Sequence, residues 1–296
     1  MNVSGLAQTV VDSLAMGSLY AIFTLGIALI FSVLKMINFA HSELVTMGAF
    51  VLILMNDSPL IFRVAVTLAV VVLTAILMER VAFRPVRGAN PTTMLITSFG
   101  VSYLLQNVAI LMFGPDVRSG NVWPFLNESF RIGSVVILNL DAITILLTIA
   151  LLICLTLFLR KTSLGLQMRA AAEDFRTARL VGVRANRVIA VAFALSGLLA
   201  AIAALLLTAQ TGVVTSTIGV QVVLMAFVAT ILGGMGSLTG AVLGAYLLGF
   251  VSVALQTFLP LELRPFRDAF LFTAVFAVLV FRPNGLIVTR MSRGRV

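Results

Sequence analysis

Four polar residues at the start of an apolar run carry the side chains best suited to chemistry in this chain: Asn38, His41, Ser42 and Glu43. His41 is the only histidine. If Asn38 caps a helix, then Asn38, His41 and Ser42 lie on one helix face at i, i+3 and i+4. Ionisable groups in membrane segments are costly and commonly mark transport paths. The group therefore predicts either a gate near the inner mouth of a path or a polar helix start at the membrane interface, where water relieves the cost.

A second set of polar side chains is uncharged and follows one side of the apolar run at 92–113. Thr93 and Thr97 lie one turn apart, and Gly100 and Leu104 continue the same face. Such a face suits a path for a compact polar solute. It equally suits hydrogen bonds between neighbouring helices, and the pattern leaves both interpretations open.

The one long charged segment of the chain is 160–187. Within it, Asp174 is suited to cap a short helix, and Gly182 is suited to end that helix in a left-handed conformation. The apolar positions between the two caps recur at i, i+3 and i+6: Phe175, Ala178 and Val181. A short helix held at a membrane surface is a docking element. The alternative is a loop that only carries positive charge.

A stripe of small residues is expected on a helix near the C-terminus. Gly236, Gly240 and Gly244 recur at i, i+4 and i+8, and small residues let helix backbones approach closely in lipid. The stripe predicts tight helix packing, either inside one subunit or between subunits.

Several kinds of chemistry are disfavoured by what the sequence lacks. The phosphate-binding pattern G-x-x-x-x-G-K-[ST] does not occur, and neither Lys35 nor Lys161 follows a glycine-rich turn. There is no Ser/His/Asp set, and one histidine without clustered ligands does not make a metal site. A role for His41 in a proton relay is weakly supported, because no further carboxylate or basic group lies in the middle of the expected spans. We therefore expect no catalytic residues, no metal, no cofactor and no enzyme activity.

The elements that must position these residues are membrane helices. The 296 residues are 60% hydrophobic and only 10% charged, whereas soluble domains carry about 25% charged residues. The composition predicts one transmembrane domain over 1–296, an all-α polytopic bundle with about nine (eight to ten) spans of roughly 20 residues each. The expected spans are 8–34, 38–55, 61–82, 92–113, 140–159, 188–210, 220–233, 238–258 and 267–281. The seventh is short and suggests a re-entrant or broken helix.

The basic residues predict the orientation of these spans. With nine passes and the N-terminus outside, the cytoplasmic side would hold the 160–187 loop and most other cations: Lys35, Arg80, Arg84, Arg87, Arg282, Arg290, Arg293 and Arg295. The outer side would hold the polar 114–139 loop and five arginines: Arg63, Arg118, Arg131, Arg264 and Arg267. Cytoplasmic loops are enriched in Lys and Arg, so the N-terminus should be periplasmic and the C-terminus cytoplasmic. Because the arginines lie between apolar runs and no aromatic residues are placed among them to stack bases, nucleic acid is set aside as a partner.

Two pairs of similar segments favour nine spans. The residues around Gly48 resemble those around Gly244, and Phe83-Arg84-Pro85 resembles Phe281-Arg282-Pro283 after a similar interval. The pattern predicts that spans 1–3 and 7–9 form a parallel repeat, as in other transporters.

Several blocks of the chain resemble one family of proteins. Residues 37–43, followed by Gly48-Ala49, are similar to the INFAHGE…GA signature of the permease subunits of branched-chain amino-acid ABC importers. The family's cytoplasmic loop resembles 169–183, and its C-terminal blocks resemble 233–241 and 281–286. The likeness covers nearly the whole chain and is closest to the shorter of the two permeases. Ser42 departs from the usual glycine, which affects how closely the backbone packs there.

The resemblance implies a function and a set of partners. The chain would be the permease of an ATP-driven importer in the bacterial inner membrane, carrying branched-chain or related amino acids. It would pair with a second homologous permease, two cytoplasmic ATPase subunits and a periplasmic binding protein. The family's motif positions in the coupling loop fall on Glu173, Asp174, Ala178 and Gly182. The alternative is a self-sufficient secondary transporter or channel for small polar solutes.

Overall fold

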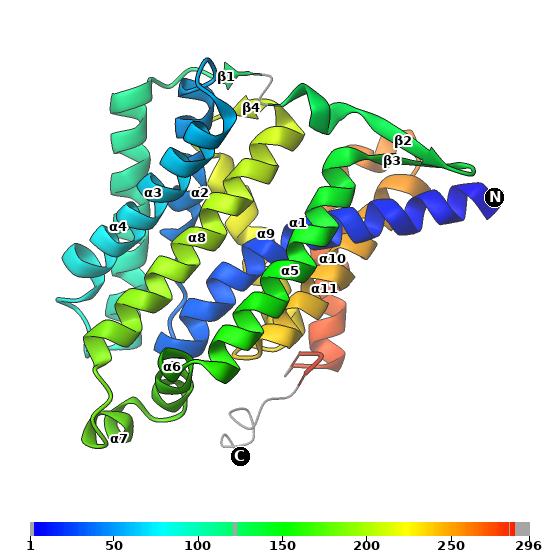
Figure 1. Ribbon diagram of the computed structural model, residues 1–296. Helices are drawn as coiled ribbons and strands as arrows, with labels where there is room; N and C mark the ends of the chain where they lie inside the picture. Colours follow the sequence, from blue (N-terminus) through cyan, green and yellow to red (C-terminus); the bar gives the residue numbers. More distant parts are fainter. Residues whose placement is uncertain (1–2, 121–122, 284, 288–296) are drawn as a thin grey trace.

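The computed structural model describes residues 3–120, 123–283 and 285–287, and it is a helical bundle with two short antiparallel sheets at one end (Figure 1). The predicted all-α class is confirmed. The bundle helices are α1 (Val3–Leu34), α2 (His41–Leu54), α3 (Leu60–Met78) with its π-helical extension η1 (Glu79–Phe83), α4 (Pro91–Phe113), α5 (Asn139–Lys161), α8 (Ala185–Thr211), α9 (Ile218–Gly233), α10 (Leu238–Phe258) and α11 (Arg267–Phe281). Between α5 and α8 lie two short helices, α6 (Ser163–Glu173) and α7 (Phe175–Leu180).

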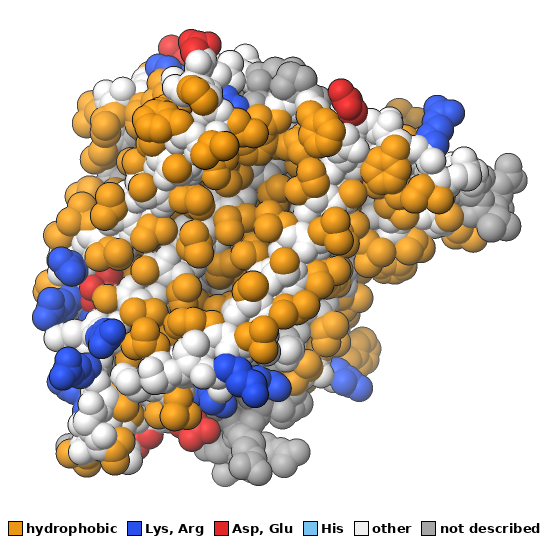
Figure 2. All heavy atoms as spheres, viewed as in Figure 1, with side chains coloured by type: hydrophobic (Ala, Val, Ile, Leu, Met, Phe, Trp, Pro, Cys, Tyr) orange, Lys and Arg blue, Asp and Glu red, His pale blue; other side chains and the backbone are white. Residues whose placement is uncertain are grey.

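Six helices of the described chain are long and apolar enough to cross a membrane: α1, α3, α4, α5, α8 and α10. By contrast, α2 and α9 are apolar but have only 14 and 16 residues, and about 20 residues are needed to span the hydrocarbon layer. Figure 2 shows hydrophobic side chains over the middle of one face, with many Lys and Arg side chains in its lower part, around α6 and α7.

The centre of the bundle is α1, which packs along α10, α8, α9 and α5. Its closest approach to α10 depends on two glycines. A Cβ at Gly249 would lie 2.5 Å from the Cα of Gly17, and a Cβ at Gly17 would lie 2.9 Å from the Cα of Tyr246. Since side chains are absent at both glycines, the two backbones form a seam through the core.

The chain re-enters the bundle after α1. Lys35 adopts a left-handed conformation (φ 55°), which ends the helix and turns the chain back. A Cβ at Gly26 would lie 2.7 Å from the His41 ring, so His41 lies beside a residue eight positions before the end of α1. At 1.5 Å per residue, α2 therefore begins about 12 Å inside the bundle.

The start of α9 lies inside the bundle as well, against the start of α2. A Cβ at Gly219 would lie 2.0 Å from the carbonyl oxygen of Ser42, and the Gly219 amide donates to Thr46 Oγ1 at 3.2 Å. The two half-length helices thus meet at their N-terminal ends. Broken helices of this kind are tolerated at membrane depth where protein buries the backbone.

The opposite end of the bundle from α6 and α7 is closed by the two sheets. The segment predicted as a polar loop forms a hairpin of β2 (Ser129–Ile132) and β3 (Val135–Leu138) and a short strand, β1 (Arg118–Ser119), paired with β4 (Val213–Val214). The amide of Val136 donates to Gln8 Oε1, and Gln8 Nε2 donates to the Val136 carbonyl, both at 2.9 Å. The hairpin therefore lies at the same end as the N-terminal part of α1. We call this end the hairpin end.

The predicted stripe of Gly236, Gly240 and Gly244 is right for two residues and wrong for one. Gly240 and Gly244 lie in α10 and face α9, where added Cβ atoms would lie 2.4 Å from the Gly233 carbonyl oxygen and 2.2 Å from that of Ala229. Gly236, however, precedes α10 and has φ +95°. It belongs to the turn between the helices, so its expected place on the stripe is wrong.

Candidate functional site

A buried polar layer joins α2 to α4. The Glu43 side chain is 1% exposed, and its Oε1 accepts from Ser102 Oγ of α4 at 3.0 Å and from Ser42 Oγ at 2.9 Å. The Ser42 hydroxyl also lies 2.7 Å from the Phe39 carbonyl, so its one proton is shared between two acceptors. Ser102 is thus the more constant donor to this carboxylate.

Along the direction of α2, aromatic side chains lie both before and after the polar layer. Towards the α6–α7 end, the Phe39 ring stacks on Phe99 of α4 at 4.2 Å and meets Phe227 of α9 at 5.9 Å. Towards the hairpin end, Phe50 of α2 stacks on Phe113 of α4 at 4.8 Å. The layer of Ser42, Glu43 and Ser102 therefore lies between two aromatic contacts, each of which includes a ring of α4.

His41 belongs to a different contact. The Ser196 hydroxyl of α8 donates to the Gly26 carbonyl at 3.0 Å, so it accepts from Nδ1–H of His41 at 3.1 Å. The neutral ring then carries its proton on Nδ1 and presents Nε2 as an acceptor. This contact ties α2 to α1 and α8, away from α4.

Three buried polar atoms of this region have no hydrogen-bond partner among the described residues: Asn38 Nδ2, His41 Nε2 and Glu43 Oε2. Buried polar groups are nearly always paired, and each exception calls for an explanation. Within the described ranges, no group of three His, Cys, Asp or Glu is placed to hold a metal ion.

Three expectations for this group are wrong. Asn38 is not the helix cap: α2 begins at His41 after Ala40, and Asn38 Oδ1 accepts from the Ala40 amide at 3.1 Å. His41 and Ser42 do not share a face with Asn38, because His41 meets α8 and Ser42 meets α4. The group is not a helix start in contact with water, because the re-entrant chain carries it into the core, where each of these side chains is at most 2% exposed.

The expected polar face of α4 exists but points elsewhere. Thr93, Thr97, Gly100 and Leu104 line one shallow groove of about 460 Å³ on the outer surface of α4. Ser102 is on the other side of that helix, against α2. The structure therefore does not bring Thr93 and Thr97 together with Glu43 within one subunit.

Two serines of α4 were missed by sequence reasoning. Ser98 is fully buried, and Ser102 donates to Glu43. Their i, i+4 spacing on the face opposite Thr93 and Thr97 was an available signal.

The charged segment forms a capped helix as predicted. Thr177 N donates to Asp174 Oδ1 at 3.1 Å, and the Thr177 hydroxyl donates to the second carboxylate oxygen. Gly182 has φ +89°, and the Val183 amide donates to the Ala178 carbonyl at 3.1 Å. This bond closes the helix end in the manner of a Schellman motif.

The expected apolar face of α7 is not continuous. Ala178 is buried, whereas Val181 lies beyond the end of the helix and is 77% exposed, next to Leu180 at 85%. The side chain of Phe175 lies outside the described part of the structure. The exposed pair Leu180–Val181 forms an apolar tip at the end of α7.

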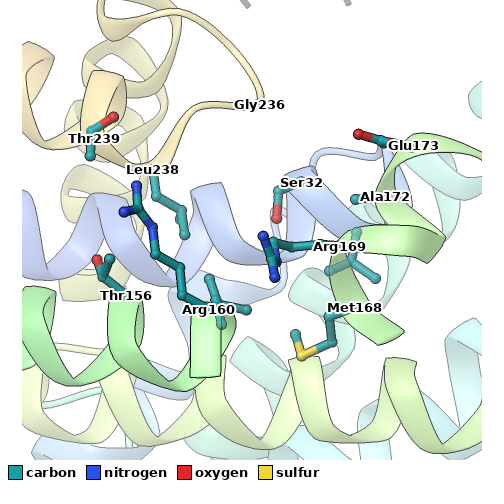
Figure 3. A pocket seen from close by; sticks show the side chains of 12 residues that line it. Ser32, Thr156, Arg160, Met168, Arg169, Ala172, Glu173, Gly236, Leu238 and Thr239 are labelled. Carbon is teal, nitrogen blue, oxygen red and sulfur yellow. The ribbon is translucent and has the colours of Figure 1, made fainter. Parts of the chain in front are cut away.

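A groove of about 350 Å³ lies on one side of α6, between α5, the end of α1 and the start of α10 (Figure 3). The side chains of Arg160 and Arg169 reach into it from α5 and α6. Thr162 alone separates α5 from α6, and its hydroxyl accepts from the Gly165 amide at 3.0 Å. The short connection and the cap fix α6 to the end of α5.

A second groove of about 600 Å³ lies between α6 and the chain that leads into α2. Ala171, Ala172 and Glu173 line it from α6, and residues 33–37 line it from the other side. Because Ala172 and Glu173 also line the first groove, the last turn of α6 stands between the two. It faces the segment that continues into the buried polar group.

Arg87 fixes the start of α8. It pairs with Glu79 of η1, which is 2% exposed, and donates to Asn186 Oδ1 at 2.7 Å. Burial lowers the pKa of Arg87, and the Glu79 carboxylate partly opposes that shift. The end of α3 is thereby joined to α8 directly after the α7 segment.

Comparisons with known proteins identify the same kind of protein along nearly the whole chain. Residues 9–281 match a family model described as a branched-chain amino acid transport system permease component. The protein is 34% identical to the high-affinity branched-chain amino acid transport system permease protein BraD of Pseudomonas aeruginosa, over 95% of each chain. It is 32% identical to LivH of Salmonella typhimurium, a protein of the same description, over 95% of this chain and 94% of the relative.

A relative of another description matches over a shorter length. The autoinducer 2 import system permease protein LsrC of Photorhabdus luminescens is 31% identical over 63% of this chain and 56% of its own. No solved structure matches the chain.

Proposed function

The chain belongs to the family of branched-chain amino acid transport system permease components, and on that premise we propose that it forms the membrane path of an ATP-driven importer for branched-chain or related amino acids. One observation carries the proposal. The last turn of α6 lies across a groove from residues 33–37, and these residues continue into the buried polar layer of α2. A motion received at α6 and α7 thus has a direct route to the path.

The coupling segment is 160–187, with Glu173, Asp174, Phe175, Ala178, Val181 and Gly182 at the contact with the ATPase. Its support is the rigid attachment of α6 to α5 and the capped form of α7. The exposed Leu180–Val181 tip offers an apolar anchor of the kind that a helix end inserts into a groove. In this scheme, ATP-driven closure of the ATPase pair displaces α7 and α6, and the segment 33–40 follows.

The partners are a second homologous permease, two cytoplasmic ATPase subunits and a periplasmic binding protein. The second permease is placed against α4, because Tyr103, Leu104 and Leu111 of α4 are strongly exposed and the groove with Thr93 and Thr97 lies on the same helix. Both threonines would then line the path only in the assembled pair. A large exposed apolar surface of this kind faces either lipid or another subunit.

We place the chain in the bacterial inner membrane with nine passes, its N-terminus outside and its C-terminus in the cytoplasm. Six passes are assigned to the helices that are long and apolar enough to cross a membrane. The other three passes are α2 and α9, completed by the chain that leads into each, and α11. Loop 114–139 is then periplasmic and loop 160–187 cytoplasmic, in keeping with the positive-inside rule. Arg290, Arg293 and Arg295, also expected inside, lie outside the described residues.

The internal repeat of spans 1–3 and 7–9 stays a prediction. Gly48 and Gly244 both stand at close contacts, where added Cβ atoms would lie 2.8 Å from the Ala204 Cβ and 2.2 Å from the Ala229 oxygen. Superposing α2–α3 on α10–α11 tests it, and a relative rotation that differs from a simple parallel overlap would contradict it.

Reconstitution tests the proposed function. In proteoliposomes that contain both permeases and the ATPase pair, radiolabelled leucine should accumulate only with ATP and the liganded binding protein. Uphill uptake by this chain alone would contradict the proposal and would favour a self-sufficient transporter.

Variants in the coupling segment test how the ATPase acts. The double change Glu173→Lys/Asp174→Lys, or Gly182→Pro, should abolish uptake while the subunit stays in the membrane. Glu128→Lys is the matched control, because Glu128 is an exposed acid at the hairpin end, and it should leave uptake unchanged. Full uptake by the coupling variants would contradict the role of 160–187.

A further inference from the structure

Glu43 is a carboxylate at membrane depth for which the described chain supplies no cation. Two ion pairs among the described residues, Arg87–Glu79 and Arg267–Asp268, do not involve Glu43. Its Oε2 is buried without a hydrogen-bond partner. An ionised carboxylate without a partner is strongly unfavourable in a low-dielectric interior, so this group is stable either with its proton retained or with a positive group brought to it.

The helix start does not account for the position of this side chain. Glu43 is the third residue of α2, where a glutamate commonly reaches back to the amide of the capping residue. Here that amide, of Ala40, is taken by Asn38 Oδ1 at 3.1 Å. The carboxylate turns instead to Ser102 on α4.

We propose that Glu43 receives the α-ammonium group of the amino acid in transit, an inference that rests on the proposed function. An ammonium carries three donors, and Glu43 Oε2, which no described residue contacts by a hydrogen bond, accepts one of them, with an unused lone pair of Ser42 beside it. The charged pair replaces the water that the substrate loses on entering the membrane.

The surroundings fit the other part of such a substrate. The rings of Phe39, Phe99 and Phe227 form an apolar surface directly beside the polar layer, against which an aliphatic side chain would pack. The same three rings lie between the polar layer and the α6–α7 end. Glu43 therefore holds the charged end of the substrate at the position where the aromatic contact must open.

Access to the layer requires the displacement of one helix. The layer is covered by α4, which packs mainly on α2 and η1. Phe99 is half exposed on α4. A shift of α4 away from α2 would separate Phe39 from Phe99 and would uncover Glu43 to the space between the two permeases.

The competing explanation is that Glu43 only fastens α2 to α4. A glutamine would do this equally well, because its amide oxygen accepts the same hydrogen bond from Ser102 without a buried charge. Substrate binding therefore requires the negative charge of Glu43, whereas fastening α2 to α4 requires only the hydrogen bond.

The test compares Glu43→Gln with Ser102→Ala in the complete reconstituted complex. Glu43→Gln keeps the acceptor and removes the charge, so ATP hydrolysis stimulated by the liganded binding protein should stay within about twofold, while leucine uptake falls about tenfold or more. Ser102→Ala removes the hydrogen bond and keeps the charge, and should retain uptake within about threefold. Glu43→Asp should recover part of the uptake that Glu43→Gln loses.

Normal leucine uptake by Glu43→Gln would overturn the inference. Absence of uptake by the unmodified complex would instead contradict the proposed function. A second measurement avoids dependence on the variants: leucine with a diazirine in its side chain, photolysed during turnover of the unmodified complex, should label residues 38–47 or 95–105. Labelling confined to other segments would also overturn the inference.

Discussion

The guanidinium of Arg87 donates to the side-chain oxygen of Asn186 at 2.7 Å across 99 positions of sequence. The same guanidinium pairs with the buried Glu79. Since Asn186 lies in the first turn of α8, which follows α7, this contact joins the chain that leaves α7 to the end of α3.

Replacing Arg87 should have a larger effect than replacing Asn186. Arg87→Ala leaves the buried Glu79 without its cation and should lower the free energy of unfolding by about 1–3 kcal/mol. Asn186→Ala removes one partly exposed hydrogen bond, worth about 1 kcal/mol or less. Thermal unfolding of the purified subunit in detergent measures both, and equal midpoints would show that the Glu79 contact contributes little.

Gly182 should be sensitive to substitution for conformational reasons alone. No atom would lie within 4 Å of an added Cβ, but φ is +89°. A left-handed residue with a side chain costs about 1–2 kcal/mol, so Gly182→Ala should loosen the end of α7 and reduce stimulation of ATP hydrolysis by the binding protein. Gly182→Asn is the control, because asparagine tolerates this conformation, and it should lie closer to the unmodified protein than Gly182→Ala.

Gly240 should tolerate no side chain. The Cβ of Gly240→Ala would lie 2.4 Å from the Gly233 carbonyl oxygen, which forces α10 away from α9 and should cost about 1–3 kcal/mol. Gly5→Ala is the matched helical control, since no atom lies within 4 Å of the added Cβ. Yield in the membrane fraction and the unfolding midpoint should fall for Gly240→Ala only. A stable Gly240→Ala would contradict the close approach of the two helices.

Gly26 should determine the position of His41. The Cβ of Gly26→Ala would lie 2.7 Å from the imidazole ring, so the ring must move and its contact with Ser196 is lost. We expect a larger loss of stability than for Ser196→Ala, which removes one hydroxyl worth about 1 kcal/mol. Unfolding midpoints rank the two variants, and the reverse order would show that His41 is free to move.

Local features of this fold were accessible from sequence because their causes are local. The apolar runs place the helices, since lipid requires every backbone group to be satisfied inside the segment. Asp174 and Gly182 mark the ends of α7 because a cap and a left-handed residue act within one turn.

The buried polar layer was not accessible because its causes are distant or unusual. Lys35 turns the chain back into the bundle in a conformation that side chains rarely adopt, and nothing in its neighbours announces this. Without that turn, Asn38 was expected at the water interface. The contact between Glu43 and Ser102 depends on the packing of α4 against α2, which periodicity alone does not specify.

The six residues from 35 to 40 have no continuous helical ladder. A continuous helix of that length would have to break several main-chain hydrogen bonds to change shape. This irregular segment can instead slide or straighten through rotations at a few backbone angles. A slip by one residue would translate the start of α2 by about 3.3 Å. Alternation between outward-open and inward-open forms could therefore be confined to one short stretch of main chain, while the seam between α1 and α10 stays unchanged.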